Sequence, residues 1–163
     1  MEKRKEYELK EVQIVPYSDE YQRIFKALNI EWIQKYFKVE AEDLKSLDHP
    51  KSYILDKGGA ILIALYAGEA IGVCALVSMD DPDYDYELAK MAVSPKAQGK
   101  GVGYLLGTAI LAEAEKRGAR SVYLESNTKL TPAIHLYKKL GFELVADRET
   151  PYERCNIQMA IQF

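Results

Sequence analysis

The clearest chemical signal in this chain is a short glycine-rich segment, Gln98-Gly99-Lys100-Gly101-Val102-Gly103. It lies between a strand-like run and a helical pattern, so its backbone N–H groups are expected in the first turn of a helix. Such N–H groups lack partners within the helix and, together with the positive end of the helix dipole, bind an anion. Lys100 adds a mobile positive charge. The segment therefore predicts a site for a phosphate-bearing cofactor.

Two common phosphate-binding patterns do not fit this segment. The dinucleotide pattern G-x-G-x-x-G needs a third glycine that is missing whether one counts from Gly99 or from Gly101. The nucleoside-triphosphate pattern G-x-x-x-x-G-K-[ST] does not occur in the sequence. Gln98, Gly101 and Gly103 instead form Q-x-x-G-x-G, which resembles the acetyl-CoA signature of the GNAT superfamily of N-acetyltransferases.

The residues that follow extend this resemblance. Residues 121–127 and 131–142 contain L-E-x-N and A-I-x-L-Y-K-K-L-G-F, in the order and at the spacing of the second half of the GNAT core. The resemblance is clear from residue 60 to residue 163 and weak before that. It implies one GNAT domain over residues 1–163, with acetyl-CoA as cosubstrate and no metal.

Hydrophobic periodicity and turn residues place these motifs on particular elements. The expected strands cover residues 8–15, 60–66, 70–78, 84–93, 121–127, 142–146 and 155–163. The expected helices cover residues 18–37, with Ser18 as N-cap, 41–47, 102–117 and a segment that starts at residue 131. The order β-α-α-β-β-β-α-β-α-β-β, which is also that of GNAT proteins, predicts an α/β fold with a central mixed, mostly antiparallel sheet and helices on both faces.

Composition narrows the class of protein further. The chain has 163 residues, of which 48% are apolar and 29% charged, and its net charge is −3. This charge gives no reason to expect a basic surface, and so neither nucleic acid nor an anionic membrane is predicted as a partner. No apolar run is long enough to span a bilayer, and the charged residues 1–6 do not resemble a signal peptide. Cys74 and Cys155 are expected to be reduced thiols in a cytoplasmic protein, either a monomer or a homodimer.

The resemblance implies transfer of the acetyl group of acetyl-CoA to a primary amine by direct attack in a ternary complex. The expected acceptor is a small molecule. A protein N-terminus or lysine is the alternative, as is a non-catalytic acyl-CoA sensor. The amine must first lose a proton, because an alkyl amine with a pKa of about 10 is mostly protonated at neutral pH. The oxyanion that forms needs a donor, and the departing thiolate benefits from a proton.

Glu87 is the candidate general base. Strand alternation predicts one face that carries Glu87, Ala89, Met91 and Val93, where apolar neighbours desolvate the carboxylate and raise its pKa. The position also matches the strand glutamate that is the base in histone-acetyltransferase-like GNAT members. Two alternatives stay open: an exposed glutamate beside the acidic residues 80–85, or a water relay in place of a direct base.

Tyr137 is the candidate general acid, since the resemblance assigns the matching tyrosine to protonation of the coenzyme A sulfur. It also belongs to an apolar helical stripe with Ala133, Leu136 and Leu140, which makes a core residue the alternative. A thiol with a pKa of about 8.5 leaves without much help, so loss of Tyr137 is expected to slow turnover without abolishing it.

The resemblance assigns further residues to the cofactor. The backbone of Met91, Ala92 and Val93 is expected beside the pantetheine arm, where a splay of the sheet exposes an N–H that polarises the thioester carbonyl. The segment from Gln98 to Gly103 is expected on the pyrophosphate. Asn127 matches the family asparagine that contacts the cofactor, although it is also an ordinary residue for capping a turn.

The acceptor side is less defined by the sequence. In the family it is built from the first helices and the last inter-strand loop, here residues 29–37 and 148–154. Trp32 either lines a pocket or, the reading we favour, packs in the core. Arg154 either recognises a substrate carboxylate or pairs with a nearby acid. The acidic residues 80–85 are expected to form a solvated loop, or else to attract a cationic amine.

Overall fold

The computed structural model describes residues 8–163, and the prediction about residues 1–6 lies outside the described residues. Seven strands and four α-helices follow one another in the predicted order within this part of the chain. The strands are β1 Gln13–Pro16, β2 Ala60–Tyr66, β3 Glu69–Ser78, β4 Tyr86–Val93, β5 Ser121–Ser126, β6 Glu143–Leu144 and β7 Ile157–Gln162. The helices are α1 Gln22–Tyr36, α2 Ala41–Asp48, α3 Val102–Lys116 and α4 Thr131–Leu140.

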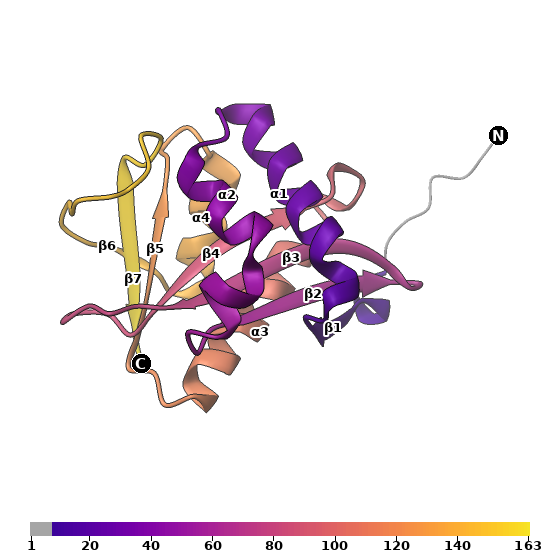
Figure 1. The fold of residues 1–163 in the computed structure, drawn as a ribbon, viewed down its shortest axis with the longest axis horizontal. Coiled ribbons are helices and arrows are strands. Elements are labelled where there is room, and N and C mark those ends of the chain that lie inside the picture. Colours follow the sequence, from indigo (N-terminus) through magenta and orange to yellow (C-terminus); the bar gives the residue numbers. More distant parts are fainter. Residues whose placement is uncertain (1–7) are drawn as a thin grey trace.

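The strands form one mixed sheet in the order β1-β2-β3-β4-β5-β7-β6. Every neighbouring pair is antiparallel except β4 and β5, which are parallel and are joined through the crossover helix α3. Helices α1 and α2 cover one face of the sheet, and α3 and α4 cover the other (Figure 1). The predicted fold class is confirmed.

Each face of the sheet has its own apolar core. On the α1/α2 face, Phe25 and Leu47 are fully buried against β2 and β3. On the α3/α4 face, Leu106 and Ile110 of α3 pack on residues such as Leu76 of β3. None of the helices in the described part of the chain combines the length and the apolar composition that a membrane span requires. The central strands β3 and β4 therefore lie between the two cores.

The structure departs from the predicted elements at the start of the chain. Leu9–Glu11 form a 3₁₀ turn where a strand is predicted, and β1 begins only at Gln13. Leu9 lies instead against the start of α3, where a β-carbon on Gly101 would come within 3.3 Å of it. The predicted N-cap Ser18 precedes a second 3₁₀ turn, and its hydroxyl donates to the Glu20 carboxylate (3.1 Å) instead of capping the backbone.

Strand β4 carries a bulge at its centre. Its register against β3 shifts between Ala75, which opposes Ala89, and Val73, which opposes Ala92. Lys90 lies inside this shift with a φ of 51°, a left-handed conformation that is uncommon for a residue with a side chain. The extra residue reverses the face to which the following side chains point.

The parallel pairing of β4 with β5 is short. Only two registered pairs join the strands, Tyr86 with Val122 and Glu87 with Tyr123. Beyond Glu87 the two strands diverge, while β5 stays paired with β7 as far as Ser126. Within the described residues, the backbone of β4 from Leu88 onward therefore has no strand partner on its β5 side, and the sheet opens there.

Candidate active site

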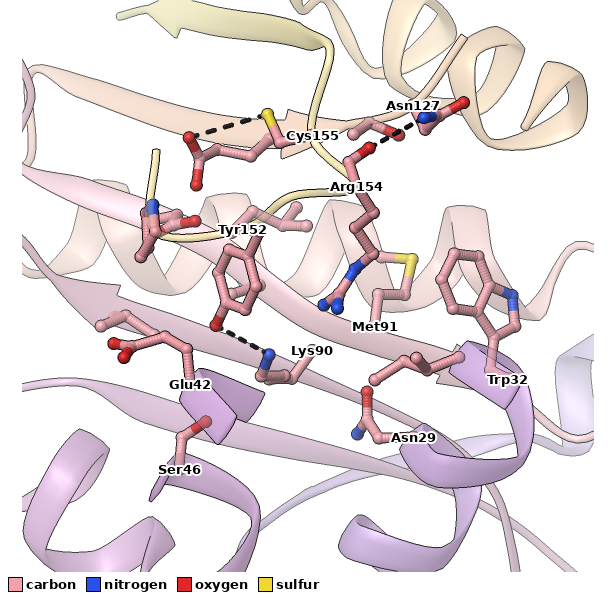
Figure 2. A pocket seen from close by; sticks show the side chains of 18 of the residues that line it. Asn29, Trp32, Glu42, Ser46, Lys90, Met91, Asn127, Tyr152, Arg154 and Cys155 are labelled. Atoms are coloured by element: carbon pink, nitrogen blue, oxygen red, sulfur yellow. Dashed lines mark hydrogen bonds between the residues drawn. The ribbon is translucent and has the colours of Figure 1, made fainter. Parts of the chain in front are cut away.

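A cavity of about 290 Å³ occupies this opening. Its walls come from β4, the end of β5, helices α1 and α2, and the segment between β6 and β7 (Figure 2). Trp32 of α1 and Phe37, which follows that helix, line the cavity and are only partly buried. The favoured prediction that Trp32 packs in the core is therefore only partly met, because one part of its side chain faces the cavity. None of the acidic residues 80–85 lines it.

Glu87 lies at the point where β4 and β5 part. Burial raises the pKa of its carboxyl group to about 7, and the neighbouring Glu125 carboxylate acts in the same direction, while the Lys90 ammonium opposes both. Within residues 8–163 the Glu87 carboxylate accepts no hydrogen bond, and it lines the cavity. A carboxylate with a pKa near neutrality is suited to take a proton at physiological pH.

The predicted alternation along β4 is wrong beyond Ala89. Glu87 and Ala89 oppose Val77 and Ala75, whose side chains belong to the core on the α1/α2 face. Met91 and Val93 instead pack with the core on the α3/α4 face. The bulge at Lys90 causes this change of face, because one additional residue in a strand moves every later side chain to the opposite face of the sheet.

Glu125 is a second carboxylate of the cavity, and sequence reasoning overlooked it. Its Oε2 accepts a hydrogen bond from the Tyr123 hydroxyl (2.9 Å) and a long contact from the Cys155 thiol (3.8 Å). Tyr123 opposes Glu87 across the strands, and Glu125 follows two residues later on the same face of β5. That spacing, read together with the parallel pairing of the two strands, was the signal available in the sequence.

Tyr137 enters the cavity from the opposite side of the sheet. It belongs to α4, and its ring packs edge-on against Phe142 with 6.2 Å between centroids. Burial raises the pKa of its phenol, and the nearby Cys74 thiol adds to the effect. Among the residues that the structure describes, the Tyr137 hydroxyl has no hydrogen-bond partner. Tyr137 is thus both a packed residue and a wall of the cavity.

The predicted phosphate segment forms the turn into α3. Gly99 and Gly101 have φ values of 74° and 87°, which only glycine adopts at little cost. Gly101 is the N-cap of α3, and the Leu105 N–H makes the first helical bond to its carbonyl (3.0 Å), so the preceding N–H groups lie outside the helical ladder. The Gln98 side-chain amide donates to the Val93 carbonyl (3.1 Å) and ties this turn to the end of β4.

The remaining residues predicted for the cofactor have structural contacts of their own. Val102 is buried in the core, and a β-carbon on Gly103 would come within 3.1 Å of Leu136. The Asn127 side chain donates to the Arg154 carbonyl (2.8 Å) and accepts from the Lys129 N–H (2.9 Å). These contacts place Asn127 in the turn after β5 at the edge of the cavity, and its role toward a cofactor stays a prediction.

Four charged side chains form a buried charge cluster beside the cavity: Glu40, Asp43, Lys90 and Arg154. Arg154 donates to both Asp43 oxygens (2.6 and 2.7 Å) and to Glu40 (3.1 Å), and Lys90 donates to Asp43 (2.7 Å). Asp43 is fully buried, and only 8% of the Lys90 side chain is exposed. Lys90 also donates to the Tyr152 hydroxyl (3.1 Å), as Figure 2 shows.

The cluster shifts the pKa values of Asp43 and Lys90. Burial alone would raise the pKa of Asp43, but the hydrogen bonds from Arg154 and the Lys90 ammonium outweigh it and hold that pKa at about 2. Burial lowers the pKa of Lys90, and Asp43 opposes this shift. Of the two readings of Arg154, the structure shows pairing with nearby acids.

Comparison with known proteins agrees with this geometry. Residues 20–142 match the model of the acetyltransferase (GNAT) family. An Escherichia coli protein described as an uncharacterized N-acetyltransferase, YjgM, is 32% identical over 99 residues, which cover 60% of this chain and 59% of that protein. The chain thus matches about 60% of the length of such a curated relative.

Solved structures share the fold at low sequence identity. A GNAT-family acetyltransferase of Staphylococcus aureus superposes with a TM-score of 0.83 at 18% identity, over 93% of this chain and 98% of the other. The acetyltransferase yncA of Salmonella typhimurium, solved with its cofactor acetyl-CoA, gives a TM-score of 0.74 at 18% identity, over 93% of each chain. These likenesses concern the fold.

The buried charge cluster predicts a strong effect of Asp43→Asn on stability. Removing the anion leaves the buried Lys90 ammonium without an ionic partner and Arg154 with Glu40 alone, so the free energy of unfolding at pH 7 should fall by about 3 to 5 kcal/mol, measured by urea denaturation. Because the pKa of Asp43 is depressed in the folded state, its contribution is complete above about pH 5 and is lost as the pH falls toward 2. The difference between variant and wild type should shrink over that range.

Glu42→Gln is the matched control for this experiment. Glu42 pairs with Lys45 (2.7 Å) on the same helix, but both side chains are well exposed. Its loss should cost less than about 1 kcal/mol. Equal effects of the two substitutions would contradict a stabilising role for the cluster.

Proposed function

This chain belongs to the acetyltransferase (GNAT) family, and we propose that it transfers an acetyl group from acetyl-CoA to the primary amine of a small molecule. The observation that carries this proposal is the position of Glu87. Its carboxylate, with a pKa of about 7, lies in the cavity where β4 and β5 diverge and has no partner among the described residues.

The residues around the opening fit acetyl-CoA. The turn from Gln98 to Gly103 offers N–H groups outside the helical ladder and the positive end of α3, which suit a pyrophosphate. Residues 91–93 of β4 present a backbone edge without a strand partner on the β5 side, which suits the pantetheine arm. The fold neighbour from Salmonella typhimurium, solved with acetyl-CoA, supports this assignment.

When bound, acetyl-CoA supplies a thioester whose carbonyl carbon an unprotonated amine attacks. Glu87 takes the proton from the ammonium form of the acceptor, and its raised pKa brings that transfer into the neutral range. A backbone N–H of residues 91–93 stabilises the oxyanion. The Tyr137 hydroxyl would donate a proton to the departing sulfur, and the tyrosinate would regain one from the nitrogen, which loses its second proton as the amide forms. Burial raises the pKa of the phenol and keeps it protonated until then.

An enzyme is favoured over a sensor because the cavity contains both proton-transfer candidates. A protein that only binds acyl-CoA needs neither the Glu87 carboxylate nor the Tyr137 hydroxyl at the divergence of the strands. A protein N-terminus or lysine is the alternative acceptor. Release of free thiol from acetyl-CoA, measured with panels of small amines and of peptides, decides among a small-molecule acceptor, a protein acceptor and a sensor. Silence across all panels despite tight cofactor binding would favour the sensor.

The phosphate-binding turn is tested by Gly101→Glu. The substitution puts a negative charge and a side chain at the N-cap of α3, so acetyl-CoA affinity measured by calorimetry should fall below detection. Gly118→Glu is the control, because Gly118 has a similar φ of 82° but lies after the C-terminal end of α3. Unchanged affinity in Gly101→Glu would remove the pyrophosphate assignment.

Glu87→Gln tests the general base through the pH profile. In the wild type, kcat/KM should rise as the pH increases through about 7, since the carboxylate is the active form. The variant should lose this limb and about 10²- to 10⁴-fold in kcat/KM, while acetyl-CoA affinity is retained. Glu143→Gln, on the exposed strand β6, should keep the wild-type profile. A profile that Glu87→Gln leaves unaltered would assign the base elsewhere.

Tyr137→Phe separates protonation of the thiolate from packing. The ring and its contact with Phe142 are kept while the hydroxyl is lost. We expect kcat to fall by about 10-fold with unchanged thermal stability and acetyl-CoA affinity, because a thiolate leaves readily on its own. A wild-type kcat would show that Tyr137 serves only as a packed residue.

A further inference from the structure

The charges that line the cavity carry information about the acceptor. Seven charged side chains contribute to the walls: Glu42, Lys45, Lys57, Glu87, Lys90, Glu125 and Arg154. The cations and the anions among them differ in how far they are already engaged with other groups of the protein. That difference bears on the charge of the molecule that fits.

The cations at the acceptor side are committed to the protein itself. The Arg154 guanidinium donates hydrogen bonds to Asp43 and Glu40, and the Lys90 ammonium donates to Asp43 and to the Tyr152 hydroxyl. A substrate carboxylate is best recognised by a free guanidinium fork or ammonium, so neither group is available for that purpose.

The two other lysines of the cavity are engaged as well. Lys45 pairs with Glu42 at 2.7 Å, and Lys57 lies over the ring of Tyr53, 5.1 Å from its centroid. Both belong to the segment from α2 to the turn before β2, whereas Glu87 and Glu125 belong to β4 and β5. Each of the four cations that line the cavity therefore already has a partner among the described residues, which leaves two carboxylates of the cavity without an ionic one.

Glu87 and Glu125 are these carboxylates, and in the described part of the chain neither forms an ion pair. Glu125 accepts from two neutral donors, the Tyr123 hydroxyl and the Cys155 thiol, and a carboxylate has room for about four hydrogen bonds. Because Glu87 opposes Tyr123, Glu125 lies about 7 Å further along the strand direction on the same face. Two anionic positions thus follow one another along the cavity.

We propose that the acceptor is an aliphatic amine with a second positive group and no carboxylate, whose reacting nitrogen meets Glu87 while the second cation pairs with Glu125. This inference rests on the proposed function and names the substrate class of the same site. Glu125 is a specificity-determining residue in this arrangement. Its ion pair with the substrate forms in a cavity partly closed to water, where such a pair is stronger than at an exposed surface.

Three amines of equal chain length test the proposal on the wild-type protein: 1,5-diaminopentane, 1-aminopentane and L-lysine. The first has two positive groups, the second has one, and the third adds a carboxylate to the diamine. Thiol release should give a kcat/KM for the diamine at least about 10-fold above each of the others, the change that one ion pair of about 1.4 kcal/mol produces. A preference for L-lysine, or equal values for all three, would overturn the proposal.

Glu125→Gln provides the second measurement. The substitution also changes the pKa of Glu87, but this change affects all substrates alike. The ratio of kcat/KM for 1,5-diaminopentane to kcat/KM for 1-aminopentane therefore reports only on the contact with the second cation. This ratio should fall toward one in the variant, and an unchanged ratio would contradict the role of Glu125. If none of the amines releases thiol although calorimetry shows acetyl-CoA binding, the proposed transfer to small amines fails with it. Activity with the wrong preference overturns the substrate class alone.

Discussion

The hydrogen-bonded pairing between β4 and β5 ends after Glu87 and Tyr123, and the cavity exists because it ends there. A parallel pair that continued would seal the sheet and bury the backbone of β4 in a ladder. The early end leaves that backbone edge open, and it lets Tyr137 from one face of the sheet reach the same space as Glu87. It also places Glu87 in a partly closed setting, which raises its pKa. The main properties of the site therefore follow from one interruption of strand pairing.

The bulge at Lys90 is coupled to this interruption by charge. A left-handed conformation at a residue with a side chain costs about 1 to 3 kcal/mol, so it persists only where the surroundings compensate. Here Asp43 binds the Lys90 ammonium, and the same carboxylate accepts the Glu40 N–H (2.9 Å) in the capping box of α2. Asp43 thus connects the start of a helix, the bulge of a central strand and, through Arg154, the segment before β7. A single buried anion holds together three segments that line the cavity.

The sequence predicts the order of elements well and their long-range contacts poorly. The helices and strands have local periodicity, and the turn at Gly101 has a local requirement for a positive φ, so both are visible in single segments. The bulge has no such signal, because lysine is not a residue that favours φ above zero. The pairing of Asp43 with Arg154 joins residues 111 positions apart, and no local pattern reveals it. For this reason Arg154 had two open readings in the sequence, and the face of Met91 was assigned wrongly.

The pKa of Glu87 results from opposing effects of burial and of charged residues that come from different segments of the chain. Burial and Glu125 raise its pKa, and Lys90 lowers it. If Lys90 were free of the buried charge cluster, its ammonium could turn toward Glu87, pair with it and hold the carboxylate at a low pKa, as opposite charges at short range do. Asp43 opposes this, since its carboxylate binds the Lys90 ammonium at 2.7 Å. The cluster therefore does more than hold the wall of the cavity in place. Among the described residues it engages Lys90 in an ion pair with Asp43, and this leaves the Glu87 carboxylate able to accept a proton.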